Sequence, residues 1–184
     1  MTAFAIDTVP HDRLTTNDVA RLRELFDEEY VVQFGEWDPD QPYGYAPHDL
    51  HVIARLGDDV VGHVGWARRT IGVGTAEVVI AGVGGVLIAP RARGEGAGAE
   101  LMAAAAASMK ESGDIEFGYL GCREEVVAFY ESCGWRRIAA VEKSIDRMGQ
   151  PVTQPAGPPV LLLPVGAPAH SWPAGAIDLR GRAW

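Results

Sequence analysis

The chain has 184 residues, 47% of them hydrophobic and 22% charged, and a net charge of −9 at pH 7. These values fit one soluble globular domain, and the negative charge argues against nucleic acid or an anionic membrane as main partner while leaving room for a cationic ligand. The first residues lack the basic and apolar regions of a signal peptide, and no apolar run approaches the ~20 residues of a membrane span. We therefore expect a cytoplasmic protein. Two cysteines provide neither a disulfide framework nor metal-ligand spacing.

The N-terminal third predicts an edge strand, a helix and a hairpin. The strand covers residues 4–9, and Thr15–Asp18 supplies N-cap residues for the helix. One face of that helix is apolar, with Val19, Leu22, Leu25, Phe26 and Tyr30. Strands over Leu50–Leu56 and Val60–Ile71 are expected to be joined by the turn Gly57-Asp58-Asp59.

Residues 31–49 predict a long loop in which acidic and aromatic residues alternate. The segment holds three prolines, two glycines and four aromatic residues. A loop of this length inside a compact domain is usually functional or mobile. Carboxylates pair with ammonium groups and aromatic rings offer a face to cations, so Glu36, Trp37 and Asp38 are candidate contacts for a cationic amine. A surface loop with aromatic plugs explains the composition equally well.

The central segment predicts a strand, a glycine turn and a helix in direct succession. A strand over Ala76–Ile88 is interrupted by Gly82, Gly84 and Gly85, which mark either a bulge or the close approach of a ligand. Residues 86–98 read VLIAPRARGEGAG, and an alanine-rich helix follows as far as Ser112. The free N–H groups and the dipole of a helix N-terminus favour an anion, and glycines let the backbone approach it.

Alternating elements continue towards the C-terminus. A strand over Ile115–Cys122, a helix over Glu124–Cys133 and a strand over Trp135–Val141 are expected in that order. Residues 146–159 predict a polar connection, Val160–Pro164 a last apolar strand, and the remainder an irregular tail.

The turn matches Arg-x-x-Gly-x-Gly at Arg93, Gly96 and Gly98, and this pattern resembles the coenzyme A pyrophosphate loop of the GCN5-related N-acetyltransferase (GNAT) superfamily. The element order also resembles that of GNAT proteins, with the second helix replaced by a loop. The resemblance implies an α/β (α+β) fold with a mixed sheet of about seven strands, splayed between the fourth and fifth and flanked by helices. It implies an acetyl-CoA site formed by Val86, Leu87, Ile88, Arg93, Gly94, Glu95, Gly96, Ala97 and Gly98. Residues 1–165 would form the acyltransferase domain, and residues 166–184 a tail near the substrate site or a dimer interface.

The helix sequence VVAFYESCGW resembles the family ending FYxxxGF, with Tyr130, Gly134 and Trp135 at the matching positions. The resemblance implies that Tyr130 is the acid that protonates the departing thiolate. Core packing is the alternative for Tyr130, although Phe129 alone can serve that purpose.

A narrower resemblance, from about Val60 to the end, is to aminoglycoside 2′-N-acetyltransferases and to nodulation N-acyltransferase (NodA-type) proteins. It rests on Gly62-His63, on Arg68-Arg69, on the segment after Val160–Pro164 and on the terminal Trp184, whose carboxylate would lie near substrate. Both groups carry a glutamate near Gly82 and Gly84, and this chain does not. The base could be the α-carboxylate of Trp184, another group reached through water (Glu36, Asp38, Glu77 and His63 are candidates), or none for an amine of low pKa.

These features together predict a metal-independent, acetyl-CoA-dependent N-acetyltransferase, in which a small cationic amine such as an aminoglycoside attacks the thioester directly. An N-acyltransferase with a longer acyl donor is one alternative, because the strand glycines could leave room for a chain. A non-catalytic acyl-CoA-binding protein is another, because the glutamate is absent. A homodimer through the C-terminal strands is also consistent with the resemblance.

Overall fold

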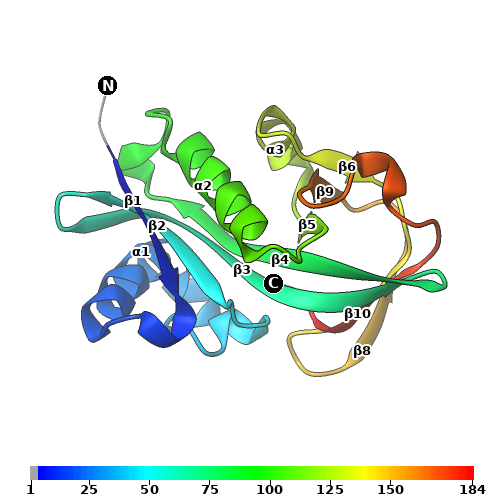
Figure 1. The fold of residues 1–184 in the computed structure, drawn as a ribbon. Helices are drawn as coiled ribbons and strands as arrows, with labels where there is room; N and C mark the ends of the chain where they lie inside the picture. Colours follow the sequence, from blue (N-terminus) through cyan, green and yellow to red (C-terminus); the bar gives the residue numbers. More distant parts are fainter. Residues whose placement is uncertain (1–3) are drawn as a thin grey trace.

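The computed structural model describes residues 4–184 as one mixed sheet covered by helices on both sides (Figure 1). The strands are β1 (Ala5–Pro10), β2 (Leu50–Leu56), β3 (Asp59–Val73), β4 (Ala76–Ile88), β5 (Phe117–Gly121), β6 (Arg136–Ile138), β7 (Glu142–Ile145), β8 (Pro151–Gln154), β9 (Val160–Pro164) and β10 (Ile177–Arg182). The helices are α1 (Thr16–Phe34), α2 (Ala97–Ser112) and α3 (Val127–Ser132), and short 3₁₀ turns lie in the connections between elements. No helix within the described residues is long and apolar enough to cross a membrane.

The sheet is larger than expected, with ten strands in place of about seven. Its main order is β6-β9-β5-β4-β3-β10-β7-β8. Strand β2, which pairs with β1, lies along the first half of β3 on the same edge as β10. The polar connection over 146–159 contains β8, and the tail expected to be irregular contains β10, so both of these expectations are wrong. Both strands are short: β8 forms a hairpin with the preceding β7, whereas β10 pairs with the more distant β3 and β7.

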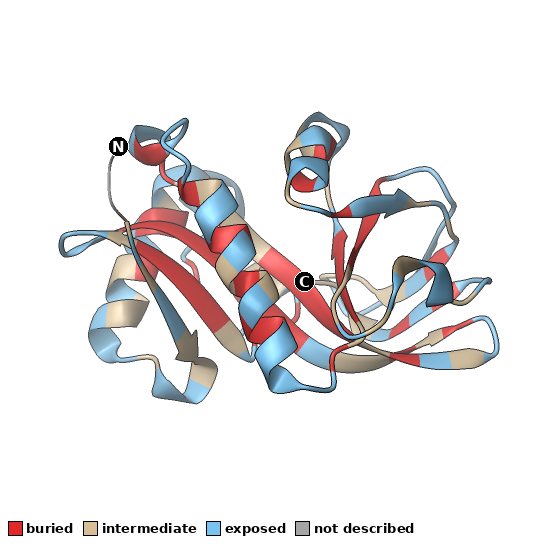
Figure 2. Cartoon of the chain, turned by 45° about the horizontal axis from the view of Figure 1, so that its top comes forward, coloured by how far each residue is buried: buried red, intermediate tan, exposed pale blue. Residues whose placement is uncertain are grey.

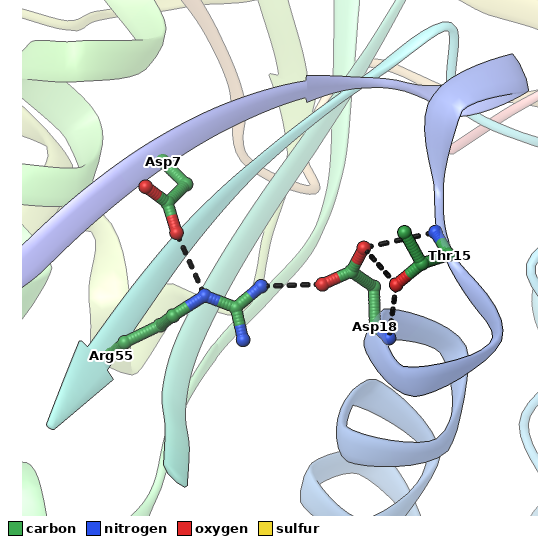
Figure 3. Close-up of polar contacts among 4 residues, drawn as sticks. All are labelled: Asp7, Thr15, Asp18 and Arg55. Carbon is green, nitrogen blue, oxygen red and sulfur yellow. Dashed lines mark hydrogen bonds and ion pairs between the residues drawn. The ribbon is translucent and has the colours of Figure 1, made fainter. Parts of the chain in front are cut away.

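Helix α1 begins where its capping residues predict and ends later than expected, at Phe34, so the following loop starts at Gly35. Thr15 Oγ1 accepts the backbone N–H of Asp18 at 3.1 Å, and the Asp18 carboxylate accepts the N–H of Thr15 at 2.9 Å. Arg55 on β2 donates to Asp18 at 2.6 Å and to Asp7 on β1 at 2.7 Å (Figure 3). These contacts fasten the start of α1 to the first two strands.

Helices α1 and α2 lie on opposite faces of β3 (Figure 1). On one face, Trp66 Nε1 donates to Ser108 Oγ of α2 at 2.9 Å, and a Cβ on Gly62 would lie 2.7 Å from Leu101 of α2. On the other face, the ring of His63 meets Phe26 of α1 with centroids 5.3 Å apart. Successive strand residues alternate between faces, so even and odd positions of β3 belong to two separate interiors. Buried residues accordingly run along β3 and β4 and along the inner side of α2 (Figure 2).

Strands β4 and β5 separate as expected. Their parallel pairing covers only Ile80–Gly82 of β4, against Phe117–Tyr119 of β5, while β4 continues to Ile88. Along its other edge, β4 carries a bulge: Gly84 pairs with Gly65 and Leu87 with His63, so Gly85 and Val86 together oppose a single β3 residue. Gly85 has φ 57°, a conformation that favours glycine. The splay leaves the end of β4 without a neighbour on the β5 side.

Candidate functional site

The glycine turn after β4 leaves the start of α2 open. Gly94 and Gly96 have φ values of 80° and 93°, and a Cβ on Gly94 would meet nothing within 4 Å. Helix α2 begins at Ala97, with Gly96 as its N-cap residue. The N–H groups of a helix's first turn have no partner within the helix, so the open backbone around Gly94 leaves an anion room to approach, whereas a Cβ on Gly98 would lie 3.1 Å from the Phe129 ring.

Arg93 fastens this turn to its surroundings. Its Nε donates to the carbonyl of Ile88 at 3.0 Å, and its Nη2 lies 3.4 Å from the Glu29 carboxylate of α1. About half of the Arg93 side chain remains exposed. Val86 and Ile88 are partly exposed and Leu87 is buried, and all three lie in the part of β4 that has left β5. The residues expected at the cofactor site thus lie in consecutive parts of one segment, from the unpaired end of β4 to the start of α2, with Glu95 in the turn between them.

Tyr130 lies on α3 with only 7% of its surface exposed. Its ring contacts those of Phe129 and Trp135, with centroids 5.2 and 6.2 Å away. Burial, with smaller contributions from the thiols of Cys122 and Cys133, raises the pKa of Tyr130 well above its ordinary value. The phenol is therefore protonated at neutral pH, as an acid must be, while its ring also belongs to the core.

The C-terminal residue occupies the space that the β4 glycines leave. A Cβ on Gly82 would lie 2.2 Å from the Trp184 ring, and a Cβ on Gly84 would lie 2.5 Å from the carboxyl carbon of Trp184. Of the two explanations offered by the sequence, the bulge applies at Gly85, whereas the close approach at Gly82 and Gly84 is made by another part of this chain and not by a ligand. The approaching group is the chain's own terminus.

Several contacts hold this terminus in place. The guanidinium of Arg69 stacks on the Trp184 ring at 3.9 Å, and Arg69 Nη1 donates to the carbonyls of Leu179 and Arg182 at 3.1 and 2.7 Å. The N–H of Ala46 donates to the carbonyl of Ala183 at 2.8 Å. These contacts hold the carboxyl carbon of Trp184 beside Gly84.

The acidic loop is organised differently from the expectation. Trp37 is buried, stacks on Phe26 with ring centroids 4.9 Å apart, and donates its backbone N–H to Asp27. Its ring is a core side chain and offers no free face to a cation. Glu36 and Asp38 are exposed, and the Asp38 carboxylate accepts the N–H of Asp40 at 2.9 Å. An aromatic residue flanked by acids does not by itself reveal whether the ring faces inward.

Two other candidate bases are engaged elsewhere. His63 is fully buried and hydrogen-bonds through both ring nitrogens, to the carbonyl of Gly85 and to His51. Burial lowers its pKa to about 4, which the bond to Gly85 partly offsets. Glu77 forms an ion pair with Arg180 at 2.7 Å on the surface. Neither side chain is free to take a proton from a substrate.

A cavity of about 650 Å³ opens beside the C-terminus. It is lined by residues of the loop, β7, β8 and the tail, among them Tyr43, Tyr45, Glu142, Asp146, Arg147 and Ala183. Glu142 accepts a hydrogen bond from the hydroxyl of Tyr119, the β5 residue in register with Gly82. Burial raises the pKa of Glu142. This cavity could not be found from the sequence, because its walls come from four segments without a shared motif.

Comparison with known proteins places the chain in a family. The family model described as nodulation protein A (NodA) matches residues 8–183, whereas no curated protein sequence matches. Among solved structures, Escherichia coli ElaA is similar at a TM-score of 0.61 and 19% identity, covering 87% of this chain and 98% of its own. An acyl-CoA N-acyltransferase from Pseudomonas aeruginosa has a TM-score of 0.60 and 18% identity, covering 88% and 99%.

A GNAT family acetyltransferase from Brucella melitensis, solved in complex with acetyl-CoA, has a TM-score of 0.59 and 16% identity and covers 94% of each chain. At these identities the structural likeness establishes the fold, which is that of the GNAT acyltransferases, as expected. The family match spans nearly the whole chain, from the end of β1 to the residue before the C-terminus. The chain therefore belongs to the nodulation protein A (NodA) family.

Proposed function

We propose that this protein transfers an acyl group from a coenzyme A thioester to the amine of a small molecule. Two neighbouring features support this best: β4 separates from β5 after Gly82, and an open glycine turn leads from the end of β4 into α2. A thioester needs a narrow slot for its arm and an anion site for its phosphates, and these two features lie at the two ends of one segment, residues 83–98.

In this proposal the amine attacks the thioester carbonyl directly. The nitrogen–carbon bond forms, the carbon–sulfur bond breaks, and the backbone N–H groups around Val86–Ile88 stabilise the oxyanion between these events. The amine proton passes to the α-carboxylate of Trp184, and the thiolate takes the phenolic proton of Tyr130. The position of the terminus beside Gly84 supports this choice of base, since no glutamate stands there.

We propose a cationic amine as the acceptor, with the aminoglycoside-like class as the first to test. The cavity beside Ala183 has the carboxyl groups of Glu142 and Asp146 and the rings of Tyr43 and Tyr45 in its walls, together with Arg147, whose guanidinium lies 5.3 Å from the Tyr45 ring centroid. Carboxylates and aromatic faces are the groups that bind ammonium ions. Glu36 and Asp38 are exposed in the loop that also contains Tyr43 and Tyr45, and they remain candidate contacts for the cationic amine.

The family match favours a second candidate, in which the donor carries a longer acyl chain. The space beside Gly82 and Gly84 is filled by Trp184 and His48, so these glycines leave no room for a chain on that face. This packing supports the acetyl donor as the first candidate. A protein that binds acyl-CoA without turnover is the third outcome to be distinguished.

The experiment that decides among these candidates measures release of the coenzyme A thiol. Acetyl-CoA and a long-chain acyl-CoA would each be offered with a panel of aminoglycosides and polyamines. Release with acetyl-CoA supports the first proposal, and release with the long-chain donor alone supports the second. Binding of either donor by calorimetry with no release on any amine would contradict both.

Tyr130→Phe tests the acid. Removing the hydroxyl is expected to lower kcat by about 100-fold, the lower end for a general acid, while the dissociation constant of acetyl-CoA stays unchanged. Tyr30→Phe is the matched control, because it removes a hydroxyl from a partly buried tyrosine outside the proposed machinery. Equal kcat values for the two variants would remove Tyr130 from the mechanism.

Neutralising the chain terminus tests the base. A semisynthetic protein with a C-terminal amide keeps the Trp184 ring in its contact with Arg69 and removes only the carboxylate. We expect kcat to fall by about 100-fold or more, with the rate recovering as pH rises because free amine becomes more abundant. An amide-terminated protein with full activity at neutral pH would assign the base elsewhere.

A further inference from the structure

A line of hydrogen-bonded side chains runs from the surface to the bulge in β4. At the surface, the Asp40 carboxylate lies 2.9 Å from His11 Nε2. His11 Nδ1 is 3.1 Å from His51 Nε2, and His51 Nδ1 is 2.9 Å from His63 Nε2. His63 Nδ1 completes the line, 2.7 Å from the carbonyl oxygen of Gly85. His11 in the 3₁₀ turn after β1, His51 on β2 and His63 on β3 thus form one continuous chain, and Asp40 of the loop lies at its outer end.

The carbonyl at the inner end fixes the direction of every bond. A carbonyl oxygen only accepts, so His63 Nδ1 carries a proton and donates it. Burial lowers the pKa of both His63 and His51, so each ring is neutral at pH 7 and has one donor and one acceptor nitrogen. His63 Nε2 must then accept from His51 Nδ1, and His51 Nε2 must accept from His11 Nδ1. The contact with the Asp40 carboxylate is a hydrogen bond only when His11 also has a proton on Nε2.

The other groups near these rings do not offer a competing arrangement. His48 lies 5.8 and 5.9 Å from His51 and His63 by ring centroids, and within the described residues its own buried nitrogens have no hydrogen-bond partner. The other aromatic side chains that contact His63 in residues 4–184 are Phe26 and Trp37, which do not titrate. No group of three or more His, Cys, Asp or Glu side chains in residues 4–184 has a metal-binding arrangement.

The chain ends on the peptide group that joins the two bulge residues. The carbonyl belongs to Gly85 and the N–H of the same peptide group to Val86. Within the described part of the chain, neither residue has a registered partner on β3, and β4 has already left β5 at Gly82. A hydrogen bond accepted by the carbonyl of a peptide group polarises it and makes its N–H a stronger donor.

We propose that His11, His51 and His63 are positioning residues that orient and polarise the Gly85–Val86 peptide for catalysis. This inference rests on the proposed function, in which the Val86 N–H faces the developing oxyanion of the thioester. The chain holds the Gly85 carbonyl turned into the sheet, which directs the N–H of Val86 the opposite way, and each bond in the line strengthens the next. No proton leaves the chain, because its inner end is a carbonyl.

The first test reads the direction of the bonds without any activity. Nitrogen-15 NMR at pH 7 is expected to show the rings of His51 and His63 each protonated on Nδ1 and unprotonated on Nε2. A proton on Nε2 of either ring would overturn the proposal, because the chain could not then end on Gly85 in the order given.

The second test separates the effect of the N–H that donates to the Gly85 carbonyl from the effect of the imidazole ring that carries it. His63→Phe removes the donor, whereas His63→Asn places an amide N–H near the former Nδ1 position. We expect the Val86 amide proton to shift upfield and kcat to fall about tenfold in His63→Phe, with the acetyl-CoA dissociation constant unchanged, and His63→Asn to recover part of both losses. Equal kcat and equal Val86 shifts in the two variants would overturn the proposal.

The third test acts far from the buried site. His11→Phe interrupts the chain at a partly exposed ring, and the exposed His170→Phe is the matched control. The Val86 amide is expected to shift in the same direction as in His63→Phe, with about a threefold lower kcat. An unchanged Val86 shift would overturn the coupling. If the wild-type protein releases no thiol on any amine, the proposed function fails, and the NMR tests still decide the geometry.

Discussion

The two faces of β3 and β4 differ in chemistry although both are buried. The face towards α2 is apolar, with Leu101, Met102, Ala105 and Met109 packed on the sheet and one internal hydrogen bond, from Trp66 to Ser108. The face towards α1 holds the rings of His48, His51, His63 and Trp184, packed against glycines. The extent of burial alone therefore does not show which face contributes more to the stability of the fold. The difference lies in which groups are buried and how their hydrogen bonds are met.

The polar face has a thermodynamic cost that the apolar face lacks. Both ring nitrogens of His48 are buried and have no partner among the described residues. Burial, with smaller contributions from His63 and His11, lowers the pKa of His48 to about 3. A buried neutral imidazole without hydrogen bonds destabilises the fold, and such groups persist mainly where function requires them.

Truncation on the apolar face should give the largest effect on stability. Leu101 is completely buried against Gly62, so Leu101→Ala is expected to lower the free energy of unfolding by about 2–5 kcal/mol. Turnover per folded molecule should not change. Denaturant unfolding together with kcat of the folded protein checks both statements. A lower kcat for Leu101→Ala under conditions in which the variant is fully folded would show that the two faces are not separate in function.

Adding one methyl group on the polar face should have a smaller effect on stability and a direct effect on activity. In Gly82→Ala the new Cβ would lie 2.2 Å from the Trp184 ring, so the terminus must move. We expect a loss of about 1–3 kcal/mol in stability and a marked fall in kcat. Gly72→Ala is the matched control, since its nearest atom would be 3.7 Å away. Identical behaviour of the two variants would contradict the position of Trp184.

The smallest effect concerns pH. The pKa of His48 is lowered in the folded state, so its contribution to stability is present above the unfolded value near 6.5 and is lost as pH falls towards 3. In His48→Phe the decline of stability between pH 6 and 4 should be shallower by about 1 kcal/mol per pH unit. Urea unfolding at several pH values measures this slope. An unchanged slope would mean that His48 is not a buried neutral ring.

The apolar face could be predicted from the sequence almost residue by residue. Leu101, Met102, Ala105 and Met109 recur at helical spacing, and all four are buried. The polar face could be predicted only in part. The glycines of β4 indicated a bulge or a close approach, and the terminal tryptophan resembled a substrate-contacting end, but the two signals stand 100 residues apart and nothing local joins them.

Several features were decided by the sequence itself. The bounds of β2, β4 and β9 follow from apolar runs closed by turn residues, and the start of α1 follows from the Thr15 capping box. The glycine turn before α2 follows from conformations that favour glycine. In each case the determining interactions lie within a few residues, so a local pattern carries the information.

Tertiary structure alone decided the remainder. The sequence of β10 carries too little pattern to predict a strand, and it becomes one because β3 and β7 offer hydrogen bonds on both sides. Trp37 is a core residue because Phe26 of α1 stacks on it. The histidine chain joins residues 11, 51 and 63 to the carbonyl of Gly85 across four separate segments. Such contacts depend on which strands become neighbours, and the periodicity of one segment does not contain that information.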